Sequence, residues 1–212
     1  MPDEKITKAV EEAIKSAKPR KFTETVEMAI NLKEIDMSIP KNRIKEDIII
    51  PHGKGKEVKV AIICGKEMAE KAKGVADLII LPEELESYAE DKKKTKKLAN
   101  SYDFFVAEAP LMPTIGRVLG KALGPRGKMP KPLPPGSDPS GIIEALRKTV
   151  SLNSKDKLVV HAPVGRADMA PEQIAENIEA ILKRLTTKLE RGSYNIKSAY
   201  VKTTMGPSVR II

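Results

Sequence analysis

The 212-residue sequence predicts a protein of mixed α+β and α/β class, in which one domain is inserted into another. Segments near both ends alternate polar and apolar residues, as strands with one buried face do. The middle of the chain alternates apolar strands with helices, which is typical of a parallel sheet. Because neither terminal segment has enough apolar surface for a core of its own, we expect one α+β domain from residues 1–53 and 148–212 and an inserted α/β domain from residues 54–147.

The terminal domain is predicted to begin with a helix and a strand. Asp3 can cap the helix, whose apolar residues recur at four-residue intervals until Pro19 ends it. Polar and apolar residues then alternate over residues 25–32, which predicts a strand with Thr25 and Glu27 on the same outer face. The remaining elements of this domain are strands at 47–50, 149–152, 158–162 and 196–204 and a helix that begins at Pro171.

The inserted domain is predicted to begin with a strand that is covered on both faces. Residues 58–64 form a nearly continuous β-branched and apolar run, the pattern of a buried parallel strand. Strands at 77–81 and 104–109, helices at 67–73, from Pro82, at 114–123 and at 141–148, and a Gly- and Pro-rich loop at 124–139 follow. The chain crosses between the domains near residues 53–55 and near Lys148, so we expect a hinge motion there.

Charge and composition restrict the class of partner. The formal net charge is +9 and the isoelectric point is near 9.4, so the surface attracts polyanions. No segment approaches the roughly 20 apolar residues of a membrane span, and residues 1–20 lack the apolar core of a signal peptide, so we expect a cytoplasmic protein with no membrane partner. Aromatic residues make up only 3% of the chain, so RNA would be recognised through backbone shape, hydroxyls and phosphates.

The reactive side chains form no catalytic or metal-binding pattern. Cys64 is the only cysteine and lies in an apolar run, as a buried structural thiol does. His52 and His161 have no cysteine or carboxylate partner at metal-ligand spacing. A catalytic pair of His161 with Asp168 or Glu172 would need a nucleophile and an orienting group that the sequence does not announce. We therefore expect a non-enzymatic protein with no metal and no cofactor.

Two basic motifs could in principle bind phosphates. The lysine-rich run at 91–97 could displace counterions from RNA, but we interpret it as the solvated face of a helix. The loop at 120–128 resembles a phosphate cradle, but Ala122 and Met129 stand where a P-loop needs Gly and Ser or Thr. This loop is interpreted as a tight turn or a contact with RNA backbone. It also motivates an alternative function, a nucleotide-binding α/β enzyme.

The last predicted strand is polar on one face. Period-two alternation places Ser198, Lys202 and Thr204 together, and all three can donate hydrogen bonds. After the strand, Gly206 would let a backbone approach a ligand closely, and Pro207 would fix the turn. This chemistry fits a binding site and an ordinary solvated edge strand equally well.

Five blocks of sequence resemble, in matching order, the large-subunit ribosomal protein L-one family. They are residues 21–27 (KFTETVE), 51–55 (PHGKG), 123–127 (LGPRG), 161–165 (HAPVG) and 200–210 (YVKTTMGPSVR). The resemblance covers essentially the whole chain. It implies a split β-α-β type α+β domain built from both termini and an inserted Rossmann-like, three-layer α/β domain. The short N-terminal segment is similar to that of the archaeal branch.

The resemblance also implies a function and partners. Members of the family bind large-subunit (23S-type) rRNA at the mobile side stalk next to the E site, where they are implicated in release of deacylated tRNA. Many also repress translation by binding a similar structure in their own mRNA. For this chain, the implied partners are large-subunit rRNA, its own mRNA and E-site tRNA, with a monomer outside the ribosome. A non-specific basic nucleic-acid binder is a further alternative.

Carried over by motif, the candidate RNA-binding residues come from both ends of the chain. They are Lys21, Phe22, Thr25, Glu27, Arg166, Ser198, Thr204, Met205, Gly206 and Pro207. Glu27 would accept a hydrogen bond from a ribose 2′-OH or a guanine amino group, and Lys21 and Arg166 would contact phosphates. Phe22 would pack on a ribose or in the core. Met205 would reach RNA only if the chain turns there.

Overall fold

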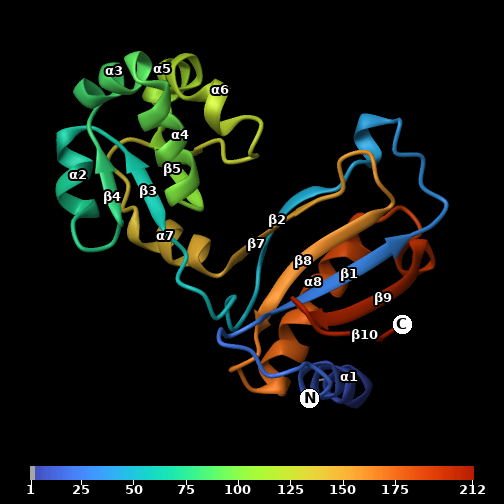
Figure 1. The fold of residues 1–212 in the computed structure, drawn as a ribbon. Coiled ribbons are helices and arrows are strands. Elements are labelled where there is room, and N and C mark those ends of the chain that lie inside the picture. The colour runs from blue at the N-terminus through green and yellow to red at the C-terminus, as the bar shows by residue number, and fades with distance from the viewer. Residues whose placement is uncertain (1–2) are drawn as a thin grey trace. The chain divides into compact units, whose positions relative to one another are not determined.

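The computed structural model describes residues 3–212 and confirms the mixed α+β and α/β class. Its contacts divide the chain into two compact units (Figure 1). The terminal unit consists of Met1–Lys56 and Lys148–Ile212, and the inserted unit consists of Glu57–Arg147. Within residues 3–212, no helix combines the length and the apolar character that crossing a membrane requires.

The terminal unit contains a four-stranded antiparallel sheet with the order β10-β9-β1-β8 (Figure 1). Its strands and its two α-helices are α1 (Glu4–Lys15), β1 (Thr25–Leu32), β8 (Val159–Arg166), α8 (Pro171–Lys188), β9 (Ile196–Thr203) and β10 (Ser208–Arg210). Helix α1 is capped as predicted, because the Asp3 side chain accepts a hydrogen bond from Lys5 N at 3.0 Å. The bounds predicted for β1 are confirmed, whereas β8 continues past its predicted end.

One face of this sheet forms the core of the terminal unit. Every second residue of β1, from Val26 to Leu32, is buried. These side chains belong to one apolar cluster with Val10 of α1 and Ile178 of α8. The β1 residues of opposite parity, which include Thr25 and Glu27, are only partly buried. The sheet therefore presents a polar face on the side opposite to its apolar core.

Two further strands form a separate ribbon in the terminal unit. Strand β2 (Lys45–Ile49) pairs antiparallel with β7 (Thr149–Asn153), and the 3-10 turns η1 (Pro40–Asn42) and η3 (Gly192–Asn195) complete the unit. The hydroxyl of Ser154 accepts a hydrogen bond from Ile44 N at 2.9 Å, which holds one end of the ribbon together. Strand β2 begins two residues before its predicted start.

The buried Asn177 side chain ties the first chain crossing to the terminal unit. Asn177 is fully buried in α8. Its Oδ1 accepts a hydrogen bond from His52 N at 3.1 Å, and its Nδ2 donates to Gly53 O at 3.0 Å and to Val164 O at 2.8 Å. The loop predicted as a crossing point is thus anchored, and the unit boundary lies after Lys56.

The inserted unit is built on a parallel sheet with the order β4-β3-β5-β6. Its elements are β3 (Val60–Ile63), α2 (Lys66–Ala72), β4 (Leu78–Ile80), α3 (Pro82–Glu90), α4 (Lys92–Ser101), β5 (Phe104–Glu108), η2 (Ala109–Leu111), α5 (Met112–Val118), α6 (Gly120–Leu123), β6 (Lys131–Leu133) and α7 (Ser140–Arg147). One apolar cluster contains Leu98 of α4 and Ile115 of α5, and a second contains Met68 of α2 and Ile143 of α7. The sheet is therefore packed on both faces.

Candidate nucleic-acid interface

The pairing of β1 with β9 brings the two predicted halves of the site together. In this register Glu27 lies opposite Lys202, and Asn31 lies opposite Ser198. A carboxylate and an ammonium group on one sheet face form a favourable cross-strand pair. Ser198 is buried, and its hydroxyl accepts a hydrogen bond from Asn31 Nδ2 at 2.9 Å. Among the predicted site residues, Ser198 is thus largely engaged within the sheet.

Thr204 joins the end of β9 to the start of β1. Its backbone N–H donates to Thr25 O at 3.0 Å. Its hydroxyl accepts from Thr25 N at 3.3 Å and lies 3.2 Å from Thr25 O, to which it can donate. Because a hydroxyl has two acceptor positions, one of them stays available to a ligand. The two halves predicted from opposite ends of the chain therefore meet at Thr25 and Thr204.

The chain turns directly after Thr204, as the prediction for Met205 requires. Gly206 N donates to Thr203 O at 3.2 Å, which closes the turn between β9 and β10. The Met205 side chain is 58% exposed. The turn therefore presents a flexible apolar side chain to solvent, next to the hydroxyl of Thr204.

Glu24 is a residue of this site that the motif-based prediction missed. Its side chain is buried, and its Oε2 accepts a hydrogen bond from Met205 N at 2.9 Å. This hydrogen bond lowers the pKa of the Glu24 carboxyl, against the effect of burial. The Thr203 hydroxyl, the positive charge of Arg20 and that of Lys202 lower it further. The alternation of the strand could have revealed Glu24. This residue precedes Val26 by two positions, so the strand pattern places its side chain on the core-facing side.

Gly206 has an internal reason to be glycine. A Cβ at this position would lie 2.3 Å from Thr203 Oγ1 and 3.4 Å from the Cβ of Ala17. The Thr203 hydroxyl is buried and forms no hydrogen bond of normal geometry. Close packing inside the protein therefore adds to the expected approach of a ligand backbone as an explanation for Gly206.

Replacing Gly206 by alanine is expected to destabilise the terminal unit by about 1–3 kcal/mol, because the added methyl group overpacks the turn. Urea titration followed by circular dichroism would measure the change in the free energy of unfolding. Ser208→Ala is the control, since Ser208 is exposed in the same hairpin and its substitution should change stability by less than about 0.5 kcal/mol. Equal stability of the Gly206→Ala variant and the parent would contradict the close packing.

The segment before β1 provides exposed cationic and aromatic groups. Lys21 is exposed, and the Phe22 side chain is 55% exposed. The alternative that Phe22 belongs to the core is therefore wrong. Phe22 and Arg20 line a hollow of about 240 Å³ whose wall also includes Thr203. An aromatic face and cationic groups thus lie close to the turn at Thr204–Pro207.

Arg166 lies opposite Thr25 in the pairing of β8 with β1. Its Nη1 donates to Gly55 O at 3.3 Å, and its Nη2 lies 3.4 Å from a carboxylate oxygen of Asp168. The Asp168 side chain is more than half exposed, so this ion pair is weak. A phosphate could replace the carboxylate without disturbing the hydrogen bond to Gly55.

The basic motifs of the inserted unit have structural roles. The lysines of the 91–97 run are exposed on α4, which confirms the interpretation of a solvated helix face. Lys128 Nζ donates to Ala99 O at 3.0 Å and to Tyr102 O at 2.7 Å, at the C-terminal end of α4. A cation at this end of a helix is favourable because the last carbonyls carry partial negative charge. The predicted loop is thus partly helical, because residues 120–123 form α6, and Lys128 attaches its other end to α4.

The strand ends of the inserted sheet do not favour a nucleotide. Ligands of open α/β sheets bind at the carboxyl ends of the strands, where the strand order reverses. There, the Glu108 carboxylate lies against Gly65, since a Cβ on Gly65 would come within 3.5 Å of its Oε2. A carboxylate at this point repels phosphate groups.

Burial, helped by the charge of Glu108, raises the pKa of the Cys64 thiol to about 11, so Cys64 is an unreactive structural thiol.

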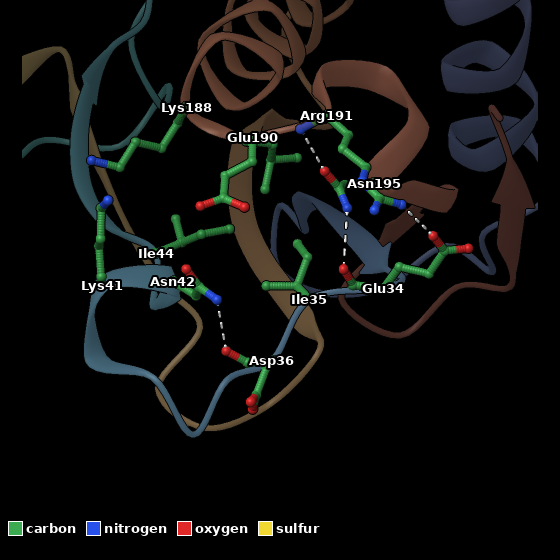
Figure 2. Close-up of a pocket in the computed structure, with 11 residues that line it drawn as sticks. Glu34, Ile35, Asp36, Lys41, Asn42, Ile44, Lys188, Glu190, Arg191 and Asn195 are labelled. Carbon is green, nitrogen blue, oxygen red and sulfur yellow. Dashed lines mark hydrogen bonds and ion pairs between the residues drawn. The ribbon is translucent and has the colours of Figure 1, made fainter.

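A larger pocket lies at the far end of β1 from Thr25 (Figure 2). It has a volume of about 270 Å³, and its wall carries both acidic and basic side chains. The Arg191 guanidinium pairs with the Glu34 carboxylate at 2.9 Å, and Arg191 N donates to Asn195 Oδ1 at 2.9 Å. The wall has three acidic residues (Glu34, Asp36 and Glu190) and three basic residues (Lys41, Lys188 and Arg191), so the pocket offers no excess charge to a polyanion. Among the side chains that the structure describes, which leave out those of residues 1, 2, 89 and 90, no group of three or more His, Cys, Asp or Glu could hold a metal ion.

Comparison of the sequence with known proteins places this chain among ribosomal proteins. The sequence model of the Ribosomal protein L1p/L10e family matches residues 10–207. The chain belongs to this family. It is 56% identical over 206 residues to the large ribosomal subunit protein uL1 of Thermoplasma volcanium, covering 97% of this chain and 95% of that protein.

Other archaeal relatives match over nearly their whole length. The large ribosomal subunit protein uL1 of Archaeoglobus fulgidus is 51% identical over 99% of this chain and 98% of its own. The protein of the same name from Pyrococcus horikoshii is 53% identical over 98% of this chain and 95% of its own. The resemblance to the L-one family and to its archaeal branch is confirmed. Membership in a family of ribosomal proteins also confirms the prediction of a non-enzymatic protein.

Proposed function

We propose that the chain is a structural protein of the large subunit of the cytoplasmic ribosome and binds 23S-type rRNA at the mobile side stalk. The observation that carries the proposal is the meeting of Thr25 and Thr204 at one end of the sheet, beside the exposed side chains of Phe22 and Met205. Hydroxyls, an aromatic face and a thioether side chain together suit a folded RNA backbone with accessible riboses.

The distribution of charge supports binding through the terminal unit. This unit contains 23 Lys and Arg residues and 16 Asp and Glu residues, a net charge of +7. The inserted unit contains 15 and 13, a net charge of +2. Electrostatic attraction therefore brings a polyanion mainly to the unit that contains the candidate interface. We expect the affinity for RNA to fall as the salt concentration rises.

Each group of the interface has a distinct chemical part. Glu27 is partly exposed beside Lys202 and can accept a hydrogen bond from a ribose 2′-OH or a guanine amino group. Thr204 offers its remaining acceptor position, and Met205 and Phe22 provide apolar contact with riboses or bases. Lys21 and Arg166 contact phosphates, which positions the RNA without reading its sequence.

The same interface would also suit a second RNA. An mRNA segment that copies the shape of the stalk would occupy the same residues, so we propose that the chain also represses translation of its own message. We further propose that it takes part in release of deacylated tRNA from the E site and is a monomer outside the ribosome. The chain crosses twice between the predicted domain of residues 1–53 and 148–212 and the inserted domain of residues 54–147. These crossings would supply a hinge for the domain motion that accompanies tRNA release.

Competition between RNA and DNA tests the proposal. The full chain is titrated with a labelled side-stalk RNA hairpin, and unlabelled RNA or duplex DNA of the same sequence is added as competitor. A site that reads 2′-OH groups should release its ligand to RNA but not to DNA. Equal competition by both would instead identify a non-specific basic binder.

A further inference from the structure

Glu24 occupies a position that would normally hold an apolar side chain. It has the parity of the buried residues of β1, and it is only 6% exposed. A buried carboxylate costs free energy unless it is paired or accepts hydrogen bonds. A carboxylate at this position therefore needs a specific partner.

That partner is the turn between β9 and β10. In this turn Thr204 N–H donates to Thr25 O, and Gly206 N–H donates to Thr203 O. Between them, Met205 N–H donates to the Glu24 carboxylate at 2.9 Å. A hydrogen bond to an ionised acceptor is roughly twice as strong as one between neutral groups. The turn is thus held to the start of β1 at Met205 by a side chain and at Thr204 by the backbone.

The backbone of Glu24 makes a second connection. Its carbonyl accepts a hydrogen bond from Ala167 N at 2.9 Å, directly after Arg166. The Arg20 Nε lies 3.8 Å from its Oε1, which keeps the carboxylate paired. Glu24 is therefore bonded to all three segments that provide the candidate RNA-binding groups, although its own carboxylate is buried and does not face a ligand.

We propose that Glu24 is a positioning residue of the RNA interface. By accepting the Met205 N–H, its carboxylate fixes the turn at Thr204–Pro207 against Thr25. A displacement of the turn by as little as about 1 Å would take the Thr204 hydroxyl and the Met205 side chain out of register with the groups of β1. This inference rests on the proposed function, and its test is separable from the test of that function.

Three variants of the full chain test the inference by affinity for the side-stalk RNA hairpin. Glu24→Leu keeps the bulk but loses the acceptor, and it should weaken binding about tenfold. Glu24→Gln keeps an oxygen that can accept the Met205 N–H and should bind within about threefold of the parent. Glu34→Gln is the matched control, because it makes the same change in net charge at the far end of β1. It should bind like the parent.

Two further readouts separate positioning from direct contact and from simple loss of stability. The dependence of affinity on salt should have the same slope in parent and Glu24→Leu, since Glu24 touches no phosphate. Hydrogen exchange of the Met205 amide should be faster in Glu24→Leu, at a temperature where circular dichroism shows the chain to be folded. If Glu24→Leu does not fold, Glu24→Ser, whose side chain is too short to reach Met205, takes its place.

Two results would contradict the role of Glu24 alone, and a third would contradict the proposed function as well. Parent affinity in Glu24→Leu would overturn the inference and leave the proposed function intact. Equal losses in Glu24→Gln and Glu24→Leu would also overturn it, because charge and not the hydrogen bond to Met205 would then control affinity. A parent that itself fails to bind the RNA would end both the proposed function and the role of Glu24 in it.

Discussion

Replacing Thr204 by valine is expected to weaken binding of the side-stalk RNA by about ten- to a hundredfold, which corresponds to about 1.4–2.8 kcal/mol. Valine has nearly the same shape but cannot hydrogen-bond. It would remove the acceptor position that faces the ligand and the hydroxyl contacts with Thr25 N and O. The loss inside the protein should cost only about 1 kcal/mol of stability. Calorimetric titration at a temperature well below unfolding would measure the change in affinity.

The control for this substitution is Thr187→Val on α8. Thr187 is exposed to solvent, and its hydroxyl, like that of Thr204, lies within hydrogen-bond distance of a backbone carbonyl, here Lys183 O at 3.0 Å. Its replacement should leave RNA affinity unchanged. If the Thr204→Val variant bound the RNA as tightly as the parent, the interface would lie elsewhere.

Replacing Asn177 by leucine is expected to reduce the stability of the terminal unit by about 2–4 kcal/mol, because three backbone groups would lose a hydrogen-bond partner at once. These groups are His52 N–H, Gly53 O and Val164 O. Leucine branches at the same atom as asparagine and is the larger residue, so a cavity does not explain the loss. Chemical denaturation of the full chain, with the transition of the terminal unit followed at an isotopically labelled site in α8, would measure it.

A neighbouring residue provides the comparison for Asn177. Glu176 pairs with the His52 ring, and both side chains are partly exposed to solvent. Glu176→Gln should therefore change stability by no more than about 1 kcal/mol. Similar losses in the two variants would show that the buried amide has no special role in holding the loop.

Much of the fold could be predicted from periodicity. The period-two pattern of β1 and the apolar run of β3 were sufficient because each strand is long or is buried along its length. Strands β6 and β10 were not predicted. Each has three residues, too few for a period to appear, and β6 contains Pro132, which normally argues against a strand. Their formation depends on neighbouring strands that supply the hydrogen bonds.

The candidate interface could be predicted only in part. Parity places Thr25 and Glu27 on one face, because it depends on local backbone geometry. The hydrogen bond of Ser198 depends on the side chain of Asn31, which lies opposite it only after the strands pair. The role of Glu24 depends on Met205, 181 positions later in the sequence. Such contacts are set by tertiary structure, so no local pattern predicts them.

The distance along the chain between β1 and β9 has a consequence for synthesis of the protein. All strands of the inserted sheet lie within residues 57–147, so this unit can fold while the chain is still being made. Strand β1 must wait for β8 and β9, and the turn at Thr204–Pro207 is translated only after both of these strands. Prematurely terminated chains would therefore lack the complete interface. If the protein represses its own message, only copies translated past this turn would contribute to repression.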